Sequence, residues 1–132
     1  MLCHPHNPVG TNFSRDELVK LGEYIIERGL FICSDEIHCD LILGKDLHHI
    51  SPASLTSKVA EKTITLMAPS KTFNIAGFGC SFAIISNYSF HSYIQSNIPK
   101  YSLNDVNFVS KNDSKIGFVE IDNNHFVEAQ VV

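Results

Sequence analysis

The chain has 132 residues, of which 44% are hydrophobic and 18% are charged, and its formal net charge is −4. This apolar content is enough to bury a core, which excludes a chain that is disordered throughout, and no apolar run approaches the ~20 residues of a membrane-spanning helix. An acidic balance with only two arginines also excludes a nucleic-acid surface, because such a surface needs clustered cations.

Helical and strand signals alternate along the first part of the chain. Ser14 and Glu17 have the spacing of a capping box, and apolar residues then recur at helical spacing up to Gly29, which predicts a helix over 15–28. The run 30–34 is apolar up to Cys33 and ends in Ser34, and it is typical of a strand buried on both faces of a parallel sheet. The other elements expected here are a short helix over 52–61 and strands over 63–67 and 80–86.

This alternation predicts the α/β class, with helices covering a mainly parallel sheet. We expect residues 1–86 to form part of such a domain. Residues 87–132 hold seven of the ten asparagines and keep no helical period for long. We therefore expect a tail there that is either weakly structured or imported from another context, with one strand around 118–121.

Three short segments place polar residues at strand ends or in tight turns. In open α/β sheets, ligands bind at the carboxyl ends of the strands. One crossover unit separates Asp35 from Lys71, so a carboxylate and an amine are expected at the same sheet edge. The three segments are His6-Asn7-Pro8-Val9-Gly10, Ser34-Asp35-Glu36-Ile37-His38 and Ala68-Pro69-Ser70-Lys71-Thr72-Phe73-Asn74.

Each segment also has a simpler interpretation. Taken alone, Lys71 is a surface lysine after a turn, Asp35 a solvated strand end, and Asn7-Pro8 a turn. The histidines and cysteines among residues 3–39 match no zinc-binding spacing, and His48-His49 is interpreted as a polar loop pair, so we expect no metal site. The cysteines form no CxxC pair and no secretory signal opens the chain, so we expect free thiols and a cytoplasmic protein.

In this order and spacing, the three segments resemble the large domain of fold-type I pyridoxal-phosphate enzymes, the class I/II aminotransferase superfamily. His38 and the run 70–77 point to its cystathionine β-lyase-like (C–S lyase) subgroup. The resemblance covers about residues 3–86, and because family members are several times longer, we expect an incomplete large domain. It implies pyridoxal 5′-phosphate as cofactor, an amino-acid substrate and a homodimer or other self-association, with no nucleic-acid or membrane partner.

The resemblance also implies roles for individual residues. Lys71 would form the Schiff base with the cofactor and later take the Cα proton of the substrate. Asp35 would pair with the pyridinium nitrogen. Asn7 and His38 would lie near the 3-oxygen of the ring, and Asn7 would also help to hold the substrate carboxylate. Ser70 would contact the phosphate.

Two hypotheses from different classes follow. The first is a C–S β-lyase or aminotransferase that acts through Lys71 and is impaired, because the arginine clamp of the family has no counterpart: Arg15 and Arg28 both lie on the helix predicted over 15–28. The second is a non-catalytic remnant or interaction fragment of such an enzyme. A third hypothesis is a generic α/β binding domain, but in that case the presence of all three segments in this order would be a coincidence.

Overall fold

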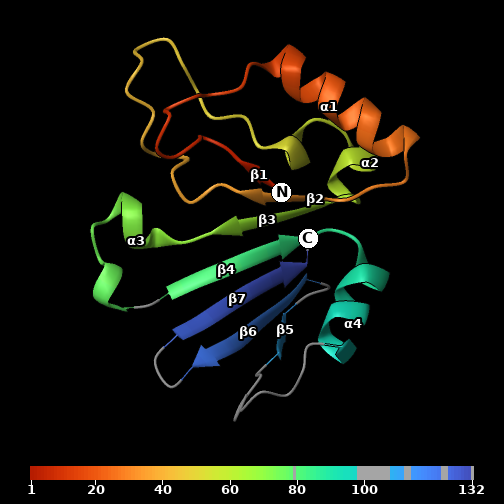
Figure 1. Ribbon diagram of the computed structural model, residues 1–132. Coiled ribbons are helices and arrows are strands. Elements are labelled where there is room, and N and C mark those ends of the chain that lie inside the picture. Colours follow the sequence, from red (N-terminus) through yellow and green to blue (C-terminus); the bar gives the residue numbers. More distant parts are fainter. Residues whose placement is uncertain (79, 98–107, 112–113, 123–124, 132) are drawn as a thin grey trace.

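Three short parallel strands near the N-terminus form one side of the sheet. The computed structural model describes residues 1–78, 80–97, 108–111, 114–122 and 125–131 (Figure 1). Leu2 pairs with Ser34, and Ile32 pairs with Thr63, in parallel register. No helix of the described residues is long and apolar enough to cross a membrane. The three strands are β1 (Leu2–Cys3), β2 (Ile32–Asp35) and β3 (Thr63–Met67).

The sheet continues beyond β3 with a change of direction. The next strand, β4 (Cys80–Ile85), runs antiparallel to β3, and the strand order is β1-β2-β3-β4-β7-β6-β5. β4 pairs with β7 in parallel, and the last three strands pair with one another as antiparallel neighbours. These are β5 (Phe108–Lys111), β6 (Ser114–Asp122) and β7 (His125–Val131).

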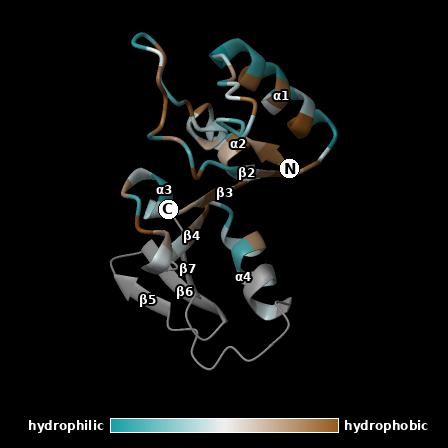
Figure 2. Cartoon of the chain, turned by 60° about the vertical axis from the view of Figure 1, so that its left-hand side comes forward, coloured by the Kyte–Doolittle hydropathy of each residue, from teal (hydrophilic) through white to brown (hydrophobic). Residues whose placement is uncertain are grey.

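The first helix follows the sequence signals closely. α1 spans Arg15–Glu27, and both hydrogen bonds of the capping box between Ser14 and Glu17 are present. Gly29 has a φ of +63°, a left-handed conformation that ends the helix. Apolar and polar residues alternate along α1 (Figure 2), and its buried positions are Leu18, Gly22 and Ile25. The prediction of a helix over 15–28 is confirmed.

The helix predicted over 52–61 is wrong as a single element. The chain forms a 3₁₀ turn, η1 (Pro52–Ser54), and then a separate helix, α2 (Ser57–Ala60). The break occurs because the Thr56 side chain accepts a hydrogen bond from the Val59 backbone N–H (3.2 Å) and so begins a new helix. The strands predicted over 63–67 and 80–86 are present within one residue of their expected bounds.

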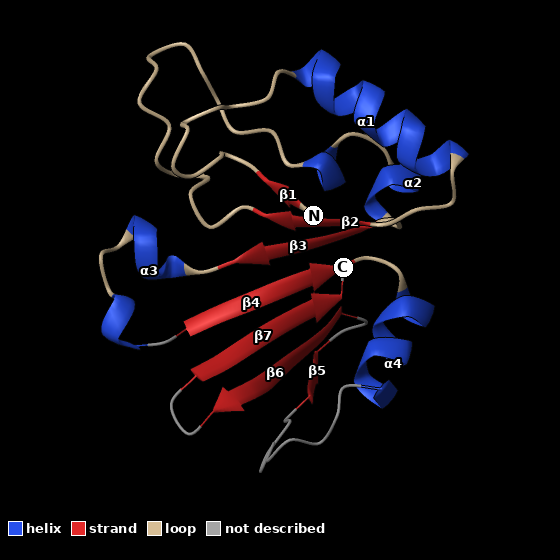
Figure 3. Cartoon of the chain, viewed as in Figure 1, coloured by secondary structure: helices blue, strands red, loops and turns tan. Residues whose placement is uncertain are grey.

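The strands β2 and β4 bury opposite faces of the sheet. On β2 and β3, the buried residues Ile32 and Thr63 are paired neighbours, and Ile32 packs with Ile25 of α1 and Val59 of α2. On β4, the buried residues are Ala83 and Ile85, and Ile85 pairs with the half-buried Ile64 on the other face of β3. Helices lie on both sides of the strands (Figure 3). The α/β class is confirmed.

β2 is buried on one face only, whereas the sequence predicted burial on both. Ile32 and Ser34 are buried, but Cys33 and Asp35 remain half-exposed on the other face. The open face at the end of β2 leaves space beside Asp35.

The expectation of weak structure after residue 86 is wrong for Tyr88–Asn97, which forms helix α4. The Asn87 side chain accepts a hydrogen bond from the Phe90 backbone N–H (2.9 Å) at its start, and the Phe90 ring stacks on Phe31 with ring centroids 4.5 Å apart. The strand expected around 118–121 lies within β6. Residues 98–107, 112–113, 123–124 and 132 of the predicted tail lie outside the described residues.

Candidate active site

The polar segments meet at one edge of the sheet. β1, β2 and β3 are parallel, so their carboxyl ends open onto the same edge, where the loops after them and helix α3 (Pro69–Thr72) gather (Figure 1). Asn7 lies in the loop after β1, Asp35 ends β2, His38 follows it, and Ser70 and Lys71 lie in α3 after β3. The topology therefore brings the five predicted residues to one edge.

Asp35 lies beside a hollow on the open face of the sheet. Its Oδ1 accepts a hydrogen bond from the Ile37 backbone N–H (3.3 Å), and its side chain is half-buried. The hollow has a volume of about 260 Å³, and apolar side chains form most of its wall. Its lining residues are Asp35, Ile37, Leu66, Met67, Ala68, Ser81 and Phe82. A carboxylate in this position can pair with a cationic ring nitrogen of a flat ligand.

Lys71 and Ser70 lie on a single helical turn directly after β3. Lys71 is exposed and Ser70 is half-buried. The turn begins at Pro69, which is favoured at a first helical position, and the chain leaves it through Asn74, whose φ of +53° is left-handed. The neighbouring Thr72 hydroxyl donates a hydrogen bond of 2.8 Å to the Asp40 carboxylate.

A second, smaller hollow of about 160 Å³ adjoins the first one. It shares Met67, Ala68 and Phe82 with the hollow beside Asp35, and Asp40 and Thr72 also line it. Lys71 and Ser70 line neither hollow.

Asn7 and His38 line a different cavity, of about 300 Å³. Asn7 is exposed and His38 is half-buried. The loop that carries Asn7 is closed by hydrogen bonds from the His6 backbone N–H to the Thr11 carbonyl (2.8 Å) and from the Gly10 backbone N–H to the His6 carbonyl (2.6 Å). The structure thus brings Asn7 and His38 together, and it places Asp35 in a separate hollow.

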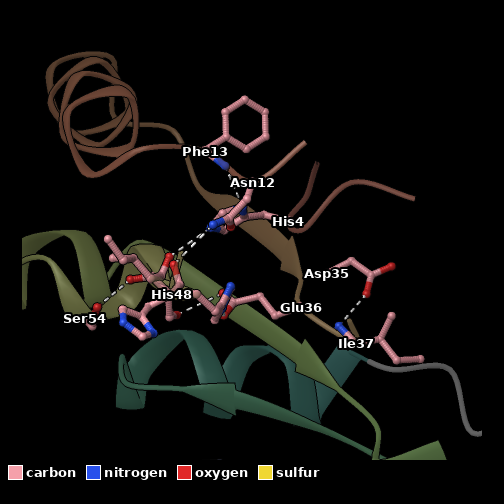
Figure 4. Close-up of polar contacts among 11 residues, drawn as sticks. His4, Asn12, Phe13, Asp35, Glu36, Ile37, His48 and Ser54 are labelled. Carbon is pink, nitrogen blue, oxygen red and sulfur yellow. Dashed lines mark hydrogen bonds and ion pairs between the residues drawn. The ribbon is translucent and has the colours of Figure 1, made fainter. Parts of the chain in front are cut away.

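Sequence reasoning missed a buried polar cluster next to Asp35. Glu36 is 1% exposed, and its carboxylate lies 2.6 Å from His49 Nε2 and accepts a hydrogen bond of 2.9 Å from the Ser51 hydroxyl. Asp35 and Glu36 point in different directions (Figure 4), as successive residues at a strand end do. The period-2 alternation of Ile32, Ser34 and Glu36 is the signal that would have placed this carboxylate on the buried face.

His4 belongs to the same cluster and is held as a neutral ring. It is fully buried, its ring centroid lies 4.7 Å from that of His49, and its Nδ1 accepts a hydrogen bond of 3.4 Å from the Phe13 backbone N–H. Its Nε2 faces the Ile50 carbonyl oxygen at 3.1 Å, which suits a proton on Nε2. Burial, and then the nearby His49, lower the pKa of His4 below its usual value.

Comparisons with known proteins place this chain in a family. The model of the family described as "Aminotransferase class I and II" matches residues 1–106, which is most of the chain. The chain belongs to the class I and II aminotransferase family. The match continues past residue 86, so the division of the chain at that residue stays a prediction.

The relatives within this family include C–S lyases and aminotransferases. Cystathionine beta-lyase PatB of Bacillus subtilis is 43% identical over 108 residues, which are 81% of this chain and 27% of PatB. The solved structure of OvoB superimposes with a TM-score of 0.70 at 45% identity, over 75% of this chain and 26% of OvoB. Cystalysin from Treponema denticola, whose structure contains pyridoxal 5′-phosphate, gives 0.68 at 44% identity, over 72% of this chain and 24% of cystalysin. The chain spans about a quarter of the length of the relatives it matches.

Proposed function

We propose that this chain binds pyridoxal 5′-phosphate and takes part in C–S β-lyase or aminotransferase chemistry on an amino acid, through a covalent bond at Lys71. One observation carries the proposal: three adjacent parallel strands end at one edge, and each leads into one of the polar segments. Asn7 follows β1, Asp35 ends β2, and Lys71 follows β3. The family membership and the cofactor in relatives such as cystalysin support this proposal.

The donor set at this edge fits the cofactor chemically. The Asp35 carboxylate, beside an apolar hollow, suits a protonated ring nitrogen, and the exposed Lys71 amine suits an aldehyde. Asn7 and His38, which share a cavity, offer hydrogen-bond donors for the ring oxygen, and Ser70 offers a hydroxyl for the phosphate.

In this proposal, each side chain has a task of its own. The cofactor, when bound, supplies an electron sink for negative charge at the substrate Cα. Asp35 keeps a proton on the ring nitrogen by its negative charge. Lys71 Nζ, once free and neutral, takes the Cα proton. Asn7 orients the substrate carboxylate with its amide.

We also propose that catalysis by this chain is weak. A guanidinium binds a carboxylate or phosphate with two parallel hydrogen bonds, which a neutral side chain does not match. The two arginines of the chain lie at the two ends of α1. Arg15 is the first residue of the helix, and Arg28 directly follows its last residue. The guanidinium of Arg28 lies 5.1 Å from the ring centre of Tyr24. A non-catalytic remnant or interaction fragment is therefore the second candidate. For either candidate we propose self-association as a homodimer.

The proposal is tested by capture of the cofactor at one lysine. Purified protein is incubated with pyridoxal phosphate and desalted, and its visible absorption spectrum is recorded. We expect an absorption band that survives desalting in the wild type, disappears in Lys71→Ala and persists in Lys58→Ala, because Lys58 lies on α2. Reduction with borohydride followed by peptide mass spectrometry then locates the covalent bond.

Each outcome favours one of the two candidates. A band specific to Lys71 supports the enzyme and leads to assays with cystathionine and with transamination substrates. If the band is missing, or equally strong in Lys71→Ala, the enzyme proposal fails and the non-catalytic remnant stands.

A further inference from the structure

We infer that the hydrogen bond between Thr72 and Asp40 positions the Lys71 turn against the segment that carries Asp35 and His38. The Thr72 hydroxyl donates to Asp40 Oδ2 over 2.8 Å and joins two residues that are 32 apart in the sequence. This inference rests on the proposed function where it concerns Lys71 as the residue that captures the cofactor.

Helix α3 depends on outside support to keep its orientation. It spans only Pro69–Thr72, and its N-cap residue, Ala68, makes no side-chain hydrogen bond to it. One helical turn does not sustain itself in water, because nucleation fixes several residues for few hydrogen bonds. Its backbone bonds, from the Phe73 N–H to the Pro69 carbonyl and from the Ile75 N–H to the Ser70 carbonyl (3.0 Å each), are local. They close the turn but do not tie it to the rest of the protein, so the turn on its own opens readily.

The segment on the other side of the bond is anchored in the protein core. Backbone hydrogen bonds of 2.9 Å from the Cys39 N–H to the Glu36 carbonyl and from the Leu41 N–H to the His38 carbonyl shape the turn around Asp40. Glu36 is buried and bonded through its side chain to His49 and Ser51, and its backbone N–H donates to the Leu66 carbonyl of β3 (2.9 Å). Asp40 therefore projects from a fixed base, four residues from Glu36.

The bond links this base to the residue next to Lys71. Asp40 and Thr72 both line the smaller hollow, which adjoins the hollow beside Asp35. A hydroxyl that donates to a carboxylate forms a charge-assisted bond, and such bonds are stronger than neutral ones. Because the pair is exposed, water replaces either partner when it is removed, so global stability changes little. What changes is how often the turn opens and how firmly Lys71 is held in place.

Hydrogen exchange without cofactor tests the positioning directly. The variants are Thr72→Val, which keeps the shape and loses the hydroxyl, Asp40→Ala, which loses the acceptor, and Thr72→Ser, which keeps the hydroxyl. We expect exchange in peptides covering residues 68–76 to be about fivefold faster in the first two variants, as loss of one hydrogen bond implies, and close to wild type in Thr72→Ser. Equal exchange in wild type and Thr72→Val would overturn the inference.

Borohydride trapping at Lys71 provides the second readout. At a subsaturating concentration of pyridoxal phosphate, Thr72→Val and Asp40→Ala should trap about fivefold less cofactor than wild type, and Thr72→Ser should trap a similar amount. Equal trapping in wild type and Thr72→Val also overturns the inference. If wild type itself traps nothing at Lys71, the proposed function fails, and hydrogen exchange alone then decides whether the bond positions the turn.

Discussion

At the scale of single residues, the buried position of His4 favours the neutral form of its ring. Its two ring nitrogens meet a backbone N–H on one side and face a carbonyl oxygen on the other, so only the neutral ring with a proton on Nε2 satisfies both. A second proton would point at the Phe13 N–H, which has no lone pair to accept it. Geometry and burial thus favour the same protonation state.

The lowered pKa of His4 predicts that acid destabilises the protein. Above the unfolded-state pKa of about 6.5, His4 is neutral in both states and its contribution to stability is fully present. As the pH falls below 6.5 towards the lower native pKa, the unfolded chain gains a proton first, so stability decreases by at most about 1.4 kcal/mol per pH unit. Urea unfolding between pH 8 and pH 5 measures this loss.

The variant His4→Gln isolates the contribution of His4 from those of the other histidines. Its loss of stability between pH 7 and pH 5 should be smaller than that of the wild type. A wild-type slope in His4→Gln would show that the ring titrates alike in the folded and unfolded chain.

Sequence reasoning found residues with a local pattern and missed those defined by distant contacts. The positions of Asp35 and Lys71 at the ends of β2 and β3 were predictable because each follows an apolar run of strand length. The bond between Asp40 and Thr72 spans 32 residues, and nothing in the local sequence of either one specifies the other. The pairing of Glu36 with His49 was missed for the same reason.

At the scale of elements, the predicted bounds of a helix were correct where the capping residues at its ends were recognised in the sequence, and wrong where they were not. α1 was predictable because Ser14 and Gly29 mark both of its ends. The single helix over 52–61 was wrong because the cap formed by Thr56 was overlooked. α4 was missed because its start depends on Asn87, in a region rich in asparagine where a cap was not expected.

Gly29 gives a direct test of how α1 ends. Its φ of +63° suits glycine, and a Cβ added there would meet no atom within 4 Å, so Gly29→Ala changes backbone strain alone. We expect a loss of about 1–2 kcal/mol in the free energy of unfolding. The control is Gly77→Ala, where a Cβ also meets nothing within 4 Å and φ is not in the left-handed range. Equal losses from both substitutions in urea titrations would contradict this explanation.

At the scale of the whole molecule, large apolar side chains are exposed in the loops around the site edge. Leu43 is 96% exposed, Val9 72% and Phe73 68%, and they lie in the segments that follow β2, β1 and β3 respectively. Apart from Met1, these are the three most exposed large apolar side chains of the described residues, and exposed apolar surface is a place where another molecule can bind.

We therefore expect the chain to self-associate through this edge. In sedimentation velocity, the wild type should form species larger than a monomer, and their share should increase with concentration. Leu43→Ser together with Phe73→Ser should shift the distribution towards monomer, because the apolar contact area is reduced. Val19→Ser, on the exposed side of α1, is the matched control. A wild type that stays monomeric at high concentration would contradict the prediction.

The parallel pairing at this edge also affects how the chain folds. Leu2 must find Ser34, and Ile32 must find Thr63, before the carboxyl ends of β1, β2 and β3 lie together, whereas β6 and β7 pair residues as close in sequence as Asp122 and His125. Closing long loops costs more chain entropy than closing a hairpin, so non-local pairing is slow. We therefore expect the edge that bears Asp35 and Lys71 to be assembled later than the hairpin of β6 and β7.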